Sequence, residues 1–375
     1  MISETSSRAI NWLRFPLIVM VLVVHIHTGH LPYVLTMRTL SEGSMGQQVF
    51  SIIITALEQI GFMTVPCFFL IAGFFFYKGM QKWEWDRYGR LLGKRVRTLL
   101  LPYILFNLIS MSVLLTGESN ALAWRNHDML PLVGWFWDST TYCVGMKNAF
   151  GFDMQLFYPE DIPLWFIRDL MVMVIISPII YSLMKRIPRV TLCLLFIVYV
   201  SGLGVGWKGF GSSALMFCTL GMYFSLKDVD MTEWAWHHRF SIHTLSVVLL
   251  IANVAFDGML YIQQIQQLFY LAASFSALSL AYSWASYRQH EVWPIFPKAS
   301  FFVYALHMAM LGSTCLLYQC HEWALAISGG GNSLIGCLTY FITDLAMIIG
   351  ICMAVYILMS RICPRLLSLF TGGRV

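Results

Sequence analysis

The feature that most constrains this chain is a series of apolar stretches, each about as long as a lipid bilayer is thick. A helix that crosses a bilayer needs about 20 mostly apolar residues. The chain has 375 residues, of which 58% are hydrophobic and 11% charged, whereas soluble domains carry about 25% charged residues. We therefore predict an all-α fold, a polytopic membrane bundle of about ten transmembrane helices. The predicted spans are residues 13–29, 48–77, 98–116, 162–184, 190–206, 212–226, 241–257, 260–284, 299–318 and 334–360.

The second predicted span, residues 48–77, is too long for one straight helix. Pro66 lies in its C-terminal half, and proline lacks the N–H group that a continuous helix needs. We therefore expect a kink or a break near Pro66.

Lysine and arginine are distributed unequally between the predicted loops. If both termini lie on one side, the opposite side holds only Arg38, Arg125, Lys147 and Lys208, and Arg168 lies within a span. The remaining 19 of the 24 basic residues then lie on the side of the termini. Because positively charged loops favour the cytoplasm, both termini are predicted to be cytoplasmic.

Two ionisable residues in the first span suggest a function. Ionisable groups inside a bilayer are costly and usually serve a function. Arg14 and His25 are separated by 11 residues, which places them on one face of a helix, about 16 Å apart along its axis. An arginine near the inner surface can hold a phosphate, and a deeper histidine can accept a proton from a hydroxyl. The alternative is a snorkelling arginine and a histidine that is simply packed between helices.

Five more ionisable residues lie within predicted spans, and one of them, Asp344, is a mid-membrane candidate for which a polar contact between helices is the alternative. Arg168 and Asp169 can line a cavity at the depth of His25 and bind substrate, or they can form a buried structural ion pair. Glu58 and His307 are further candidates for substrate binding, with polar contacts between helices as the alternative. We predict no metal site, because no CxxC or Cys/His finger spacing occurs in the sequence.

A basic segment precedes the third span. Residues 78–97 contain seven positive charges, among them Arg95 and Arg97. The segment can clamp the phosphates of a nucleotide-bearing cofactor, or it can serve only to orient the chain and attract anionic lipid. On the opposite side, the loop 117–161 combines carboxylates with aromatic residues, which can bind sugars or form an interfacial belt.

Six sequence features, in order along the chain, resemble the acyltransferase family 3 membrane proteins, which are bacterial enzymes that acylate surface glycans. Arg14 and His25 match the family's Arg–His motif. Ala72 stands where the family often has serine, and Thr98 where its basic run often has arginine. The other five matching segments are VPCFFLIAGF (65–74), KRVRTLLLPY (94–103), PLWFIRDL (163–170), GMYF (221–224) and SFFVYALH (300–307).

The resemblance implies an activity and roles for individual residues. The donor would be an acyl-CoA, most often acetyl-CoA, and the acceptor a sugar hydroxyl on a lipid-linked or exported glycan. His25 would act as general base. Arg14, Arg95 and Arg97 would bind the CoA phosphates, and Arg168 would steady the acceptor or the oxyanion. No permanently bound cofactor and no nucleic-acid partner are expected.

The resemblance also bears on organisation and location. We expect one membrane domain over residues 1–375, with its core at about 8–365, no soluble SGNH-type domain, and a place in the bacterial cytoplasmic membrane. Two alternatives remain open. Ten helices with buried charges also suit a secondary transporter of a small anionic metabolite, although no internal repeat is seen. A glycan-handling protein without catalysis would leave His25 unexplained.

Overall fold

The computed structural model describes residues 2–30, 35, 39–78, 80, 82–116, 132–203, 211–287, 293–311, 323–324, 326–327 and 333–374. Helices predominate, and each of the predicted spans overlaps at least one of them. In chain order the elements are α1 (Glu4–His30), the 3-10 turn η1 (Leu40–Glu42), α2 (Met45–Phe62), α3 (Thr64–Tyr77), α4 (Trp85–Arg95), the π-helical turn η2 (Val96–Leu100), α5 (Leu101–Thr116), α7 (Leu132–Trp135), β1 (Thr140–Lys147), β2 (Asp153–Tyr158), the 3-10 turn η3 (Ile162–Leu164), α8 (Trp165–Arg186), α9 (Pro188–Ser201), α10 (Ser212–Leu226), α11 (Met231–His237), α12 (Arg239–Ala255), α13 (Gln263–Tyr287), α14 (Ile295–Leu311), α16 (Leu334–Ile362) and α17 (Pro364–Phe370).

Several helical segments are long and apolar enough to cross a membrane. Within the described residues there are five, or up to six if the bent pair α11–α12 counts as one span. α9 and α10 are apolar but shorter. The predicted helical membrane fold is confirmed to this extent. The five segments are Glu4–Ile26, Met45–Tyr77, Ile162–Arg186, Gln263–Tyr287 and Leu334–Ile362.

The expected break in the second span is present. α2 ends at Phe62 and α3 begins at Thr64, two residues before Pro66. Pro66 has no N–H to donate to the carbonyl of Phe62, four residues earlier. The helix therefore divides at Met63.

α3 and α10 approach each other closely through two glycines. A Cβ atom on Gly73 would lie 2.2 Å from the carbonyl oxygen of Cys218, and one on Gly221 would lie 2.1 Å from that of Leu70. Small residues at a helix contact allow such close backbone approach in membrane proteins. Gly73 and Gly221 belong to two of the motifs described above, which therefore specify a helix contact.

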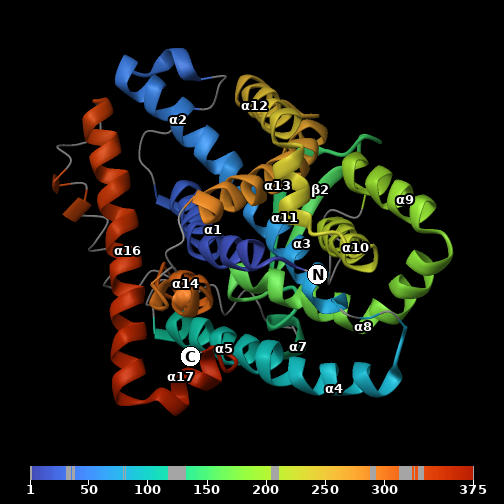
Figure 1. Cartoon of the computed structure of the whole chain (residues 1–375). Coiled ribbons are helices and arrows are strands. Elements are labelled where there is room, and N and C mark those ends of the chain that lie inside the picture. The colour runs from blue at the N-terminus through green and yellow to red at the C-terminus, as the bar shows by residue number, and fades with distance from the viewer. Residues whose placement is uncertain are drawn as a thin grey trace.

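α1 lies inside the bundle and belongs to both of its large hydrophobic clusters. It packs against α2, α13 and α14, and Figure 1 shows α16 standing at the edge of the molecule beyond α14. Leu17 contributes to the cluster formed mainly by α3, α8, α10 and α13. Leu22 contributes to the cluster formed mainly by α2, α5, α14 and α16. A helix in this position can present functional side chains where the two clusters meet.

An antiparallel hairpin, β1–β2, interrupts the helical pattern of the described residues. Its turn includes Gly151, whose φ of 82° favours glycine. The backbone N–H of Ala149 donates to the carbonyl of Ser201 at the end of α9 over 2.8 Å. The sequence analysis did not predict these strands. They occupy part of the loop 117–161, of which residues 117–131 lie outside the described part of the chain.

Candidate functional site

The central helix α1 lines two neighbouring cavities. Arg14 and Ile18 lie on the first cavity, and Val21, Val24 and His25 on the second. α1 is continuous from Glu4 to His30, so the rise between Arg14 and His25 is about 16 Å. We call these spaces the inner cavity, at Arg14, and the outer cavity, at His25. Val65 of α3 lines both of them.

The inner cavity has a volume of ≈ 460 Å³ and carries three arginines, Arg14, Arg95 and Arg374. No carboxylate is found among its described lining residues. Most of the remaining wall is aliphatic or aromatic and comes from α3, α8 and α14. Positive charge in a largely apolar cavity favours an anionic ligand, because the surroundings screen the charge less than water does.

The electrostatics of these arginines agree with an anion site. Nε of Arg95 is buried and has no hydrogen-bond partner among the described residues. Burial lowers the pKa of Arg95. The pKa of Arg374 is lowered to about 10, chiefly by burial and in addition by the positive charges of Arg95 and Arg14. The three guanidinium groups therefore repel one another, and a bound anion would relieve that repulsion.

The structure separates the two arginines that the sequence analysis assigned to phosphate binding. Arg95 ends α4 and lines the inner cavity. Arg97 lies in the π-helical turn η2, is exposed, and is not among the lining residues. Arg374, which the sequence analysis did not select, lines the cavity instead. Nothing in the sequence around Arg374 indicated that this residue would lie at the cavity.

The outer cavity has a volume of ≈ 250 Å³ and a different character. Its wall includes the aromatic side chains of Tyr158, Trp165 and Tyr270. Ser212 and Gln267 also line it and are almost fully buried, and neither Ser212 Oγ nor Gln267 Oε1 has a hydrogen-bond partner among the described residues. Buried polar atoms normally have partners, so these two atoms are candidates for hydrogen bonds to a ligand. The sequence analysis missed both residues, because uncharged polar groups within helices are common.

His25 is half-buried in the wall of the outer cavity and lies next to His307 of α14. The centroids of the two rings are 5.0 Å apart. Nδ1 of His307 lies 2.6 Å from the carbonyl oxygen of Tyr304. Because a carbonyl only accepts, Nδ1 carries the proton and Nε2 of a neutral His307 carries none. His307 is fully buried and lines neither cavity, so it lies behind His25 and does not face the space that a substrate would enter.

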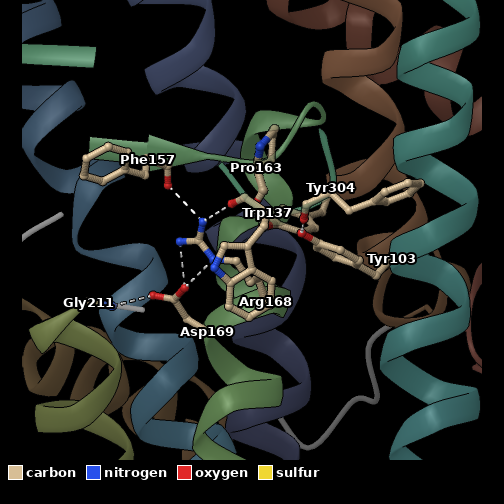
Figure 2. Close-up of polar contacts among 9 residues, drawn as sticks. Tyr103, Trp137, Phe157, Pro163, Arg168, Asp169, Gly211 and Tyr304 are labelled. Atoms are coloured by element: carbon tan, nitrogen blue, oxygen red, sulfur yellow. Dashed lines mark hydrogen bonds and ion pairs between the residues drawn. The ribbon is translucent and has the colours of Figure 1, made fainter. Parts of the chain in front are cut away.

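Arg168 and Asp169 line the outer cavity, but their polar atoms are largely used within the protein (Figure 2). Arg168 Nε and Nη2 donate to Asp169 Oδ1 over 3.0 and 2.9 Å. Its Nη1 donates to the carbonyls of Trp137 and Phe157 over 2.7 and 3.0 Å. Asp169 Oδ2 accepts from the N–H of Gly211, which precedes α10, over 2.9 Å. Four of the five N–H donors of Arg168 therefore hold the wall together, which favours the structural alternative for this pair.

Comparisons with known proteins identify the family. A family model described as an acyltransferase domain matches residues 7–356. The chain belongs to acyltransferase family 3. It is also similar to the succinoglycan biosynthesis protein ExoH of Rhizobium meliloti, with 28% identity over 209 residues. That match covers 55% of this chain and 50% of the relative, so the chain spans about half the length of this curated relative. No solved structure matches it.

Two tyrosines of the family motifs hold the backbone at Phe136 and Pro163 in place. The hydroxyl of Tyr103, in the Leu-Pro-Tyr motif, donates to the carbonyl of Phe136, and that of Tyr304 donates to the carbonyl of Pro163. Figure 2 shows Tyr103 and Tyr304 beside the Arg168–Asp169 pair. These motif residues fix the backbone that carries the partners of Arg168, so part of the family signature shapes the cavity without lining it.

Glu58 does not line the outer cavity of the acyltransferase, but it interacts with a residue that does. It is half-buried in α2 and interacts electrostatically with Tyr270, which lines that cavity. The hydroxyl of Tyr270 donates to Gln59 Oε1 over 3.2 Å. Glu58 itself is not among the lining residues. Its expected contact with substrate therefore stays a prediction, and its observed neighbour is Tyr270.

Proposed function

We propose that this acyltransferase moves an acetyl group from cytoplasmic acetyl-CoA to a hydroxyl of a lipid-linked or exported surface polysaccharide. One observation carries the proposal: a single helix takes Arg14 to a cationic cavity and His25 to a neighbouring polar one, and the two cavities share Val65. This arrangement suits a donor and an acceptor that arrive from different sides.

The inner cavity suits the donor. The phosphates of CoA would bind the arginines, because guanidinium groups match phosphate oxygens in geometry and charge. The thioester must then extend roughly 16 Å along α1 to reach His25. CoA carries its thioester at the end of a long, thin, uncharged arm, which fits the apolar wall between Arg14 and Val65.

The outer cavity suits a sugar. Its aromatic side chains can pack against the apolar face of a sugar ring, and Ser212, Gln267 and His25 offer neutral polar groups to hydroxyls. The name of the relative connects that protein with the biosynthesis of succinoglycan. This supports a polysaccharide as the acceptor here.

In the proposed reaction, a ring nitrogen of His25 takes the proton from the acceptor hydroxyl. The hydroxyl oxygen attacks the thioester carbonyl and forms a C–O bond. The resulting tetrahedral intermediate expels the CoA sulfur as its C–S bond breaks, and the proton passes from His25 to the thiolate. The products are the ester and free CoA. His307 would hold the His25 ring in position from behind, and Arg168–Asp169 would hold the wall.

For the chain as a whole, we propose ten crossings of the bacterial cytoplasmic membrane with both termini in the cytoplasm. The support is the distribution of 19 against 4 basic residues. In a cysteine-free variant, Phe150→Cys at the hairpin and Gly89→Cys in α4 should react with an impermeant maleimide from opposite sides. Reaction from the same side would contradict the topology.

The function is tested in liposomes that contain purified protein of known orientation. Radiolabelled acetyl-CoA is supplied on the cytoplasmic side, and glycan from cells that lack the gene on the other side. Covalent label on the glycan would support the proposal, and mass spectrometry of glycan from cells with and without the gene should show the same acetyl group. Label that crosses the membrane without transfer would contradict the proposal and indicate a transporter.

A further inference from the structure

The segment after α17 folds back onto the π-helical turn η2. Gly372 and Gly373 have φ values of 60° and 79°, which glycine adopts readily. A Cβ atom on Gly372 would lie 2.7 Å from both Cα and the carbonyl oxygen of Thr98. Thr371, just before them, is fully buried. The segment is therefore packed directly against the backbone of η2, where only glycine fits.

The segment after α17 binds the carbonyl group of Thr98, which the proline of the Leu-Pro-Tyr motif cannot bind. Pro102 has no N–H, so it cannot donate to the carbonyl of Thr98, four residues earlier. Nη2 of Arg374 donates to that carbonyl over 3.3 Å, and its Nη1 donates to the carbonyl of Thr371 over 3.2 Å. The guanidinium carbon also lies 4.5 Å from the centroid of the Phe301 ring. Three contacts thus fix the side chain in one orientation.

In this orientation Arg374 faces the inner cavity together with Arg14 and Arg95. Arg374 is exposed overall, and part of its side chain lines the inner cavity. Two of its five N–H groups are used by backbone carbonyls, which leaves up to three for a ligand. No described carboxylate in the lining neutralises the three charges. A guanidinium held this firmly loses little entropy when it binds an anion.

We propose that Arg374 is a third anion-binding residue of the donor site and holds a phosphate group of the acyl donor together with Arg14 and Arg95. This rests on the proposed function, in which the donor is an acyl-CoA. The residue acts in binding, and the acyl group reacts about 16 Å away along α1. The segment after α17 thereby becomes part of the donor site, although it lies far from the family motifs in sequence.

The test compares Arg374→Gln with Arg365→Gln, which removes an exposed arginine of α17 that does not line the cavity. Binding of CoA to the purified full chain is measured by calorimetry. Loss of one charge-assisted contact should weaken CoA binding roughly 10-fold to 100-fold in Arg374→Gln, whereas Arg365→Gln should bind as wild type does. Arg374→Lys, which keeps the charge, should recover part of the loss. Size-exclusion profiles and melting temperatures show that the variants are folded.

Two further measurements separate a phosphate contact from a general defect. The KM for acetyl-pantetheine, which has no phosphate, should be the same for Arg374→Gln and wild type. The salt dependence of CoA binding should become less steep in the variant, because fewer charges take part. Equal CoA affinity in Arg374→Gln and Arg365→Gln would overturn the inference. It would also be overturned if Arg374→Gln lost as much activity with acetyl-pantetheine as with acetyl-CoA. If wild type transfers acetyl groups but Arg374→Gln binds CoA normally, only this inference fails; if wild type transfers none, the proposed function fails.

Discussion

The inner and outer cavities of this acyltransferase differ in how their charges are balanced. The inner cavity presents Arg14, Arg95 and Arg374 with no described carboxylate in its lining. In the outer cavity Arg168 and Asp169 neutralise each other, while the neutral polar atoms Ser212 Oγ and Gln267 Oε1 have no partner in the described structure. Unbalanced charge calls for a charged ligand, and unpaired neutral groups call for a neutral ligand with hydroxyls. Under the proposed function, this contrast assigns the anionic donor to the inner cavity and the acceptor hydroxyl to the outer cavity.

The strongest test of this contrast is His25→Ala, which removes the proposed base and leaves the inner cavity intact. Turnover should fall about 10²- to 10⁴-fold, the usual contribution of a positioned acid or base. CoA affinity should stay the same, because the arginines are unchanged. The transfer rate of wild type should also fall as the pH drops through the pKa of the imidazole, since only the unprotonated ring can accept a proton. Equal turnover in His25→Ala and wild type would remove His25 from the mechanism.

The second test asks whether the charges of the outer cavity are structural. Asp169→Ala leaves Arg168 buried without its counterion, and such a change typically costs about 3–5 kcal/mol of stability. The melting temperature in detergent should therefore fall strongly. The matched control is Asp153→Ala, which breaks the 2.9 Å ion pair between Lys147 and Asp153 on the hairpin. Asp153 is exposed there, so solvent screening should leave the melting temperature nearly unchanged. A stable Asp169→Ala variant that no longer binds acceptor would assign the pair to substrate binding.

The third test concerns the inner cavity and separates two arginines of one basic run. Arg95→Gln should raise the KM for acetyl-CoA roughly 10-fold to 100-fold, because it removes a charge-assisted phosphate contact. Arg97→Gln should leave the KM close to the wild-type value, because Arg97 is exposed outside the cavity lining. Steady-state kinetics at constant ionic strength measures both values. An equal effect of the two substitutions would show that the basic run acts by its overall charge and not by one contact.

The sequence predicted the helical membrane fold because apolar length is a local property that can be read from a window of residues. It also predicted the break near Pro66, because proline acts within its own helix. The shared face of Arg14 and His25 follows from helical periodicity, and the structure shows both residues on cavities along α1. Interactions along one helix were therefore accessible from the sequence.

Interactions between distant segments were not accessible in this way. The position of Arg374 depends on Gly372, which packs against Thr98, 274 residues earlier in the chain. The pairing of Arg168 was visible as a neighbouring Asp169, but its bonds to the carbonyls of Trp137 and Phe157 were not. The hairpin β1–β2 was missed because each strand is stabilised by pairing with the other, and a local window of sequence does not show that pairing. Only the assembled structure shows which of these polar groups are already satisfied.

The fourth test has the smallest expected effect and examines the neutral groups of the outer cavity. Gln267→Leu removes a buried amide whose Oε1 has no partner among the described residues and which lines the cavity. If that oxygen accepts a hydrogen bond from the acceptor glycan, its loss should raise the KM for acceptor roughly 3-fold to 10-fold. The KM for acetyl-CoA should not change. Ser212→Ala should act in the same direction.

Stability distinguishes this binding role from a structural one. Removing a buried oxygen that has no partner among the described residues should cost little stability, so Gln267→Leu should melt at about the same temperature as wild type or higher. The matched control is Gln263→Leu, one turn earlier on α13. Gln263 is also buried, its amide has no hydrogen-bond partner among the described residues, and it does not line the cavity. It should leave both KM values unchanged. If the two substitutions affect the acceptor KM equally, the outer cavity does not select its ligand through Gln267. A higher melting temperature together with weaker acceptor binding in Gln267→Leu alone would show that the amide is kept for the ligand at some cost in stability.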